Sequence, residues 1–204
     1  MIYKIILIGL LLLPVFGQAQ NQTIPEKPED ISPLLIGETI PTATLKDAMG
    51  HPFPMKANIA DAPTVLVFYR GGWCPFCNRQ LAGLQEILPE LKTMGYQLWA
   101  VSTDAPDGLS ASADEQHLDY TLLSDADLAV SKQFGIAFKA PVNYHDMLPR
   151  TSGGMNKDLL LPVPAVFIVD KQGTIRFEYI NPDFKQRMDS NLLLAVARHL
   201  QPVL

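Results

Sequence analysis

The stretch Trp73-Cys74-Pro75-Phe76-Cys77 contains both cysteines of the chain, separated by two residues. Before it, residues 64–69 (Thr-Val-Leu-Val-Phe-Tyr) are rich in β-branched and aromatic side chains, which predicts a buried strand. After it, apolar residues recur at every third or fourth position and predict a helix that ends at Gly95: Leu81, Leu84, Ile87, Leu88, Leu91 and Met94. We therefore expect the cysteines on a strand-to-helix turn, with Cys74 near the N-cap and Cys77 in the first helical turn.

This placement predicts a reactive pair of thiols. Backbone N–H groups at a helix N-terminus and the positive end of the helix dipole favour a thiolate. A free thiol titrates near pH ~8.5, and helix N-termini and Cys-x-x-Cys motifs lower that pKa. Zinc binding is a weaker interpretation, because the histidines have no partner at metal-ligand spacing: His51, His117, His145 and His199. A structural disulfide would close a loop too short to stabilise much. Two inert, buried cysteines are the third alternative. We predict redox chemistry and no metal.

The N-terminus has the pattern of an export signal. Lys4 precedes a nearly continuous apolar run over residues 5–13, and Gly17-Gln18-Ala19 offers small residues at a cleavage site. Residues 1–19 are therefore predicted to be a signal peptide, and the protein to be exported to the bacterial periplasm or beyond. Residues 20–33 combine prolines with acidic residues and are expected to form a linker. Residues 34–204 are expected to form a single domain.

Further along the chain, strands are predicted to alternate with helices. Patterns typical of strands cover residues 42–45, 97–102, 120–123, 165–169 and 174–180, and patterns typical of helices cover residues 109–118, 126–134 and 184–200. In the last helix, the inward residues are expected to be Met188, Leu192, Leu193, Val196 and Leu200. The turn between residues 169 and 174 predicts a hairpin, so the sheet is expected to be mixed. The fold class is α/β with three layers.

Residues 135–162 have no clear period and are expected to form a functional loop or an insertion with short helices. His145 lies in this region and is expected to be a solvated surface residue. The net charge of −5 argues against nucleic acid or an anionic membrane surface as a partner. No motif for a haem, a flavin or a nucleotide is present, so no cofactor is predicted.

Several segments together resemble the peroxiredoxin-like branch of the alkyl hydroperoxide reductase/thiol-specific antioxidant (AhpC/TSA) family, in the thioredoxin superfamily. They are residues 68–77 (Phe-Tyr-Arg-Gly-Gly-Trp-Cys-Pro-Phe-Cys), 101–104 (Val-Ser-Thr-Asp), 122–125 (Leu-Leu-Ser-Asp) and 164–170 (Pro-Ala-Val-Phe-Ile-Val-Asp). The resemblance runs from about residue 34 to the C-terminus. It implies a thioredoxin-like fold, in which helices flank a central sheet and the active thiol lies at the start of the first helix after the core strand.

The motif departs from that family in two places. Typical members have Pro-x-x-x-Thr-x-x-Cys, whose cysteine attacks peroxide. On this chain Cys77 takes the cysteine position, Cys74 the threonine position and Arg70 the proline position. A family arginine before the late core strand falls on or near Pro164 and is missing. Trp73, Cys74, Cys77 and Pro164 also fit thioredoxin-type reductases, which implies a cis Val163–Pro164 bond and a flat surface at Trp73 and Pro164 that receives the partner.

The resemblance implies a thiol peroxidase. Cys77 would attack hydrogen peroxide or an organic hydroperoxide and become a sulfenic acid, and Cys74 would condense with it to form a Cys74–Cys77 disulfide. An external thioredoxin-like dithiol would then reduce the pair. Arg70 would supply positive charge to the departing oxygen, or else form a surface ion pair.

Two other functions remain open. One is an exported thiol–disulfide oxidoreductase, in which Cys74 is the nucleophile and Cys77 resolves the mixed disulfide. The other is a thioredoxin-fold protein that binds Cu(I) through both thiolates, with His145 as a candidate third ligand.

Overall fold

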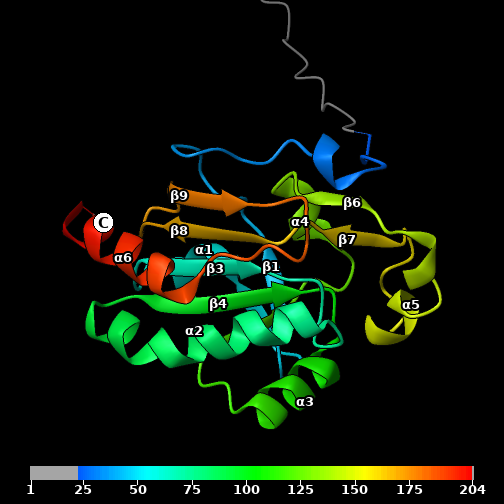
Figure 1. Ribbon diagram of the computed structural model, residues 1–204, viewed down its shortest axis with the longest axis horizontal. Coiled ribbons are helices and arrows are strands. Elements are labelled where there is room, and N and C mark those ends of the chain that lie inside the picture. Colours follow the sequence, from blue (N-terminus) through cyan, green and yellow to red (C-terminus); the bar gives the residue numbers. More distant parts are fainter. Residues whose placement is uncertain (1–22, 204) are drawn as a thin grey trace, which may run out of the picture.

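A mixed sheet forms the centre of the protein in a computed structural model that describes residues 23–203 (Figure 1). The predicted signal peptide, residues 1–19, lies outside the described residues. Within them the main sheet has seven strands in the order β2-β1-β5-β4-β3-β8-β9. The strands are β1 (Thr44–Asp47), β2 (Pro52–Pro54), β3 (Thr64–Phe68), β4 (Gln97–Ser102), β5 (Thr121–Ser124), β8 (Ala165–Val169) and β9 (Ile175–Ile180).

The sheet is mixed, as predicted. Strands β3, β4 and β5 run parallel, whereas β8 pairs antiparallel with both β3 and β9. The β8–β9 pair is the predicted hairpin, and the strands expected at residues 97–102 and 165–169 match residue for residue. Strand β3 lies in the interior of the sheet with every residue buried, so the turn that follows it starts from a rigid base.

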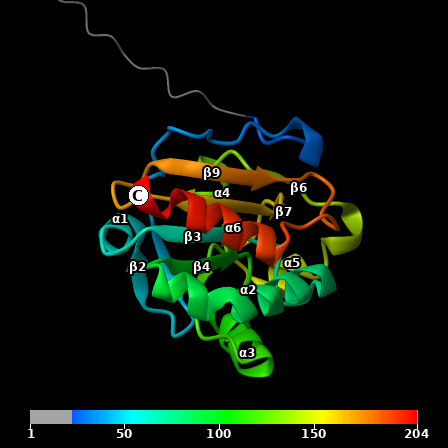
Figure 2. The same ribbon diagram turned by 60° about the vertical axis from the view of Figure 1, so that its left-hand side comes forward.

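Helices cover both faces of the sheet and complete the three predicted layers (Figures 1 and 2). One face packs against α2 (Pro75–Thr93), α3 (Pro106–Gln116) and α6 (Ser190–Leu200), and the other against α1 (Met55–Ile59) and α4 (Ala129–Gln133). Strand β3 shows the alternation that this requires. Val65 and Val67 contribute to the apolar cluster under α2 and α6, whereas Leu66 and Phe68 contribute to the cluster on the opposite face.

The region at 135–162 is an insertion with its own small sheet. Its elements are β6 (Ala137–Lys139), η2 (Val142–Tyr144), α5 (Leu148–Thr151) and β7 (Leu160–Pro162), and β6 pairs antiparallel with β7. His145 is half-buried here, and its Nε2 lies 2.8 Å from the carbonyl oxygen of Ala140. The expectation of a solvated histidine is therefore wrong, because this loop folds back on itself and gives the ring a backbone partner.

The described part of the expected linker lies against the domain. It contains the 3₁₀ helix η1 (Pro28–Asp30), and the Lys139 N–H of β6 donates to the Pro25 carbonyl over 2.9 Å. Ile31 packs against two of the apolar clusters. Residues 25–31 thus cover the edge of the small sheet instead of spanning open solvent.

The C-terminal helix is shorter than predicted, because α6 begins at Ser190. Asp189 caps it, and its carboxylate accepts the Leu192 N–H over 3.0 Å. The helix therefore has a different inward face, with Leu192 54% exposed and Leu193, Leu194 and Ala197 buried. Residues 181–189 form a non-helical segment, called here the β9–α6 connection.

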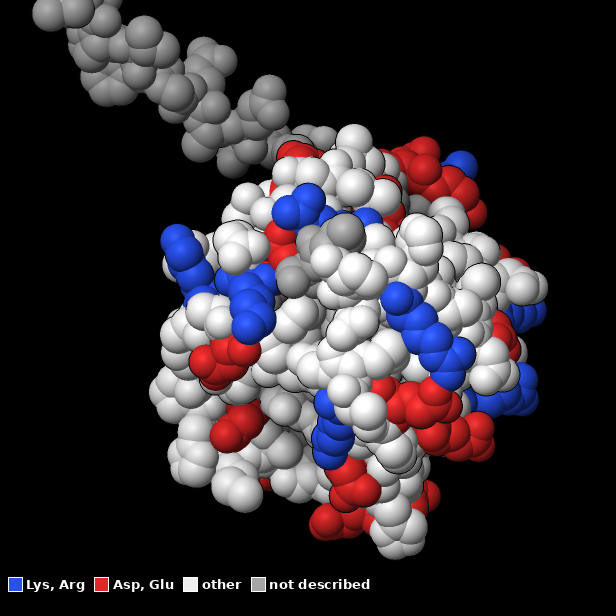
Figure 3. Space-filling model, turned by 90° about the vertical axis from the view of Figure 1, so that its left-hand side faces the viewer, with Lys and Arg blue, Asp and Glu red and all other residues white. Residues whose placement is uncertain are grey.

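Acidic and basic side chains are interspersed on the face that carries the end of α6 (Figure 3). Among the described residues, no helix has both the length and the apolar character needed to cross a membrane.

Candidate active site

The turn between β3 and α2 carries both cysteines, as predicted. Cys74 is the N-cap residue of α2 with φ −98° and ψ 114°, and Pro75 takes the first helical position. The helix ends at Thr93 and is followed by Gly95 at φ +84°, so its predicted end is confirmed. Cys77 lies in the first turn, where its N–H donates to the Cys74 carbonyl over 2.9 Å.

A glycine conformation and a hydrogen bond shape this turn. Gly71 has φ +150°, and a side chain there would collide with the indole of Trp73. The Gly72 N–H donates to the Asp104 carboxylate over 2.7 Å. Asp104 follows strand β4, so its side chain ties the cysteine turn to the end of the neighbouring strand.

Both cysteines are free thiols and almost fully buried, with 2% of Cys74 and none of Cys77 exposed. The hydrogen bond with the Cys77 thiol lowers the pKa of Cys74 to about 5, although burial opposes the shift. Burial raises the pKa of Cys77 well above its ordinary value. At neutral pH the pair therefore carries one negative charge, centred on Cys74 and stabilised by the thiol proton of Cys77.

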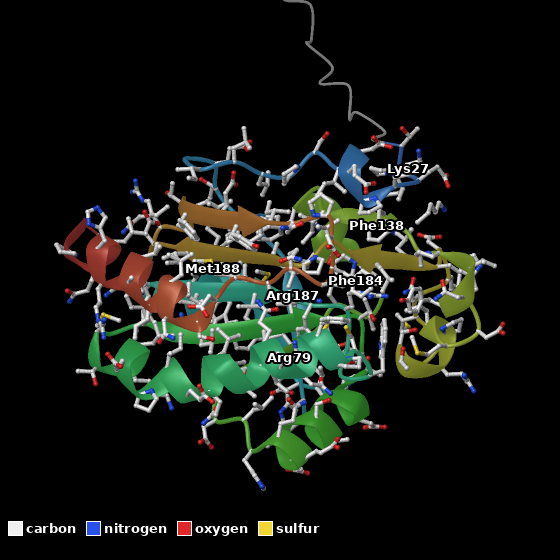
Figure 4. The ribbon with its side chains drawn as sticks, viewed as in Figure 1. Lys27, Arg79, Phe138, Phe184, Arg187 and Met188 are labelled. Atoms are coloured by element: carbon white, nitrogen blue, oxygen red, sulfur yellow. The ribbon has the colours of Figure 1, made fainter. Side chains whose placement is uncertain are left out.

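Arg187 contacts the second sulfur and was missed by the sequence analysis. Its Nη2 lies 3.4 Å from the Sγ of Cys77, within hydrogen-bond distance for sulfur. Two further bonds orient the guanidinium: Nη1 donates to the Gln80 side-chain oxygen over 3.0 Å, and Nε donates to the Phe184 carbonyl over 2.6 Å. Figure 4 shows Phe184 and Arg187 on the β9–α6 connection, over the first half of α2.

The signal that could have revealed Arg187 is the cap of the last helix. An aspartate directly before a helical period is a common N-cap, so Asp189 favours a helix start at residue 190. Residues 184–188 would then have been assigned to a loop, where functional side chains are common.

Arg70 lies at the end of β3 and is only 3% exposed, so the alternative of a surface ion pair is wrong. Its guanidinium carbon lies 4.2 Å from the ring centre of Phe184, 4.4 Å from that of Tyr144 and 4.9 Å from that of Trp73. Within residues 23–203 no carboxylate lies within 4 Å of this guanidinium. Its positive charge contributes to lowering the pKa of Cys74.

Pro164 is buried beside the same cavity as Arg70, but its peptide bond is trans, because the described residues contain no cis bond. The predicted cis bond is therefore wrong. The Val163 N–H donates to the Ile136 carbonyl over 2.8 Å, so the chain runs extended from β7 into β8 and nothing overrides the usual trans preference.

The predicted site residues otherwise come together. Arg70, Trp73, Cys74 and Cys77 share one turn, and Arg70 and Pro164 line one cavity. In the part of the chain that the structure describes, no three His, Cys, Asp or Glu side chains converge, so His145 does not join the two thiols as a metal ligand.

Comparison with known proteins gives a consistent result. The family model described as "AhpC/TSA family" matches residues 36–178. Peroxiredoxin Bcp from Escherichia coli is 31% identical over 167 residues, which cover 80% of this chain and 96% of that protein. The chloroplastic peroxiredoxin Q from Sedum lineare is 28% identical over 71% of this chain and 68% of its own length.

Solved structures show the same fold at lower identity. Peroxidoxin BcpB from Mycobacterium tuberculosis superimposes with a TM-score of 0.66 at 22% identity, covering 81% of this chain and 97% of that one. Reduced Prx3 from Vibrio vulnificus in complex with H₂O₂ has a TM-score of 0.68 at 20% identity, covering 80% and 99%. The thioredoxin-like peroxiredoxin fold is thereby confirmed.

The comparison corrects one prediction. The bacterial Bcp relatives are cytoplasmic peroxiredoxins, which contradicts the predicted periplasmic or extracellular localisation. That prediction depended entirely on the pattern of residues 1–19, which lie outside the described residues.

Proposed function

The chain belongs to the AhpC/TSA family, and we propose that it reduces hydroperoxides through the Cys74 and Cys77 pair. Its peroxiredoxin relatives identify it as a thiol-dependent peroxidase, an oxidoreductase. Proteins of this kind act on peroxides with a thioredoxin-type reductant. The specific roles of the two cysteines and of Arg187 are the content of the proposal.

The contact between Arg187 and Cys77 carries the assignment of Cys77 as the attacking sulfur. A peroxidase needs a thiolate and a positive charge where the O–O bond breaks. Arg187 contributes to lowering the pKa of Cys77 against the effect of burial, and its planar guanidinium is always protonated. Cys77 also takes the family's peroxidatic position. Arg187 thus supplies a charge that the family sequence pattern places near Pro164.

Cys74 has two roles in this proposal. As the resting thiolate, it accepts the proton of the Cys77 thiol while the Cys77 sulfur attacks the terminal peroxide oxygen. The O–O bond breaks, Cys77 becomes a sulfenic acid, and the alkoxide or hydroxide leaves and takes a proton from solvent. The Cys74 sulfur then attacks the sulfenic sulfur and water departs, which leaves a Cys74–Cys77 disulfide.

An external dithiol closes the cycle by thiol–disulfide exchange, becoming a disulfide as the pair returns to thiol and thiolate. Because Cys77 is fully buried in the structure, the proposal includes an outward movement of the β9–α6 connection that admits peroxide, followed by its return, so that Arg187 contacts Cys77 during the attack. Phe184 and Arg187 both belong to this connection. The contact of Phe184 with Arg70 and that of Arg187 with Cys77 would therefore break when it moves outward.

Single cysteine variants test the assignment. Cys77→Ser should abolish peroxide consumption. Cys74→Ser should still react once and accumulate a sulfenic acid on Cys77 that a dimedone-type probe labels. Its reaction should need a higher pH, because the base has been removed and burial raises the pKa of Cys77.

The opposite pattern would support the oxidoreductase alternative. In that case a sulfenic acid would appear only on Cys74, and Cys77→Ser would trap partner proteins as mixed disulfides on Cys74. The comparisons do not favour this alternative or the copper-binding one. Assaying one reduced preparation for both peroxide consumption and insulin disulfide reduction separates the two activities directly.

A further inference from the structure

A cavity of about 280 Å³ lies beside Arg70. Its walls are almost entirely apolar and include Phe138, Tyr144, Leu161 and Phe184, together with several prolines. Phe138, Tyr144 and Leu161 come from the insertion at 135–162, and Phe184 comes from the β9–α6 connection, which lies far from the insertion in sequence. Figure 4 shows Phe138 and Phe184 on the same side of the molecule.

Arg70 is the charged residue of this cavity, and no carboxylate of residues 23–203 pairs with it. Only 3% of this residue's surface is exposed. Among residues 23–203, no hydrogen-bond acceptor is in place for its N–H groups either. The three aromatic rings stabilise the cation through its faces. They accept nothing from its in-plane N–H donors, so these donors remain available to a ligand that enters the cavity.

We propose that this cavity binds a small apolar carboxylate, whose charged group pairs with Arg70 and whose hydrocarbon body fills the aromatic end. A guanidinium and a carboxylate match as planar groups and form two parallel hydrogen bonds. The walls suit a hydrocarbon group, because apolar surface gains by leaving water. The volume is at the small end of ligand cavities, which limits the body to a single ring or a short branched chain.

This binding does not depend on the proposed peroxidase cycle, because no sulfur takes part in it. A bound carboxylate would, however, offset the positive charge that Arg70 exerts on Cys74. The site thus differs from a pocket for neutral hydroperoxides, in which ligand charge would have no effect on affinity.

Isothermal titration with cyclohexanecarboxylate tests the proposal on the full-length reduced protein. One equivalent should bind with saturation. Cyclohexylmethanol, which has the ring without the charge, should bind at least tenfold more weakly, and so should acetate, which has the charge without the ring. Binding to the Cys77→Ser variant should be unchanged, so a failure of the peroxidase assignment does not affect this result.

Two variants locate the charge. Arg70→Met should abolish the preference for the carboxylate over the alcohol, and Arg150→Met, at an exposed arginine of α5, should leave it intact. If Arg70→Met does not fold, Asn143→Glu at the exposed rim of the cavity serves instead. Its carboxylate should compete for Arg70 and weaken binding of cyclohexanecarboxylate at least tenfold, whereas Asn143→Gln should not.

Three results would overturn the proposal. They are no saturable binding of cyclohexanecarboxylate to the wild type, equal affinities for acid and alcohol, and a folded Arg70→Met or Asn143→Glu variant that binds the acid as tightly as the wild type.

Discussion

Replacing Arg187 by methionine tests the central contact of the active site. The substitution keeps most of the side-chain volume and removes the guanidinium that reaches Cys77, Gln80 and the Phe184 carbonyl. A hydrogen bond that involves a charged group contributes about 1.5–3 kcal/mol. If the bond to Cys77 is formed fully as the thiolate attacks, kcat/KM for peroxide should fall by about 10- to 150-fold. Arg187 is half-buried, which favours the lower end of that range.

The same variant should also change the pH dependence. A cation beside a thiolate favours the ionised form, so its removal raises the pKa of Cys77 further. The rate of peroxide consumption should then rise with pH over a higher range than in the wild type. Stopped-flow measurements of peroxide loss between about pH 5 and 9 give both quantities.

Two matched variants complete this experiment. Arg79→Met removes an arginine from α2 that lies over the Phe76 ring, 5.9 Å from its centre, and has no recorded bond to either sulfur; its rate should stay within about twofold of the wild type. Gln80→Leu leaves Arg187 present but without its side-chain acceptor, and should produce a smaller loss than Arg187→Met. If Arg187→Met is as active as Arg79→Met while both unfold at the wild-type temperature, the role assigned to Arg187 is refuted.

Three further predictions follow from the site and the turn. Because the pKa of Cys74 is lowered to about 5, its thiolate absorbance should disappear as the pH falls through 5, and a midpoint near ~8.5 would contradict the structure. Burial raises the pKa of Asp104 and of Asp125 to about 6, so their protonated forms favour the folded state; this stabilisation is complete below about pH 4 and lost as the pH rises through 6. In urea unfolding at several pH values, Asp104→Asn should show less of this decline, and an unchanged slope would exclude Asp104 as a source. Gly71→Ala should destabilise the protein by about 1–3 kcal/mol, because alanine rarely adopts φ +150° and its methyl group would meet Trp73; unchanged thermal stability would show that the turn relaxes.

Much of the fold could be predicted from local patterns. The buried strand before the cysteines, the apolar face of α2, the end of that helix just before Gly95 and the β8–β9 hairpin all follow from residues close together in sequence. The elements that escaped prediction, β2, α1, β6 and β7, are three to five residues long. A segment of that length is too short to show a period of 3.6, and it forms only because a neighbour pairs with it or covers it.

For the site, too, some features follow from local sequence and others only from tertiary packing. The sequence by itself determined that two cysteines meet at a helix N-terminus, because their spacing and Pro75 act within one turn. Only the tertiary structure decided which sulfur holds the charge, because that depends on burial and on cations brought from elsewhere. Arg187 reaches Cys77 across 110 residues of sequence, and the rings around Arg70 come partly from Tyr144 and Phe184. Contacts of that range depend on how separate elements pack, and no periodicity within either element encodes them.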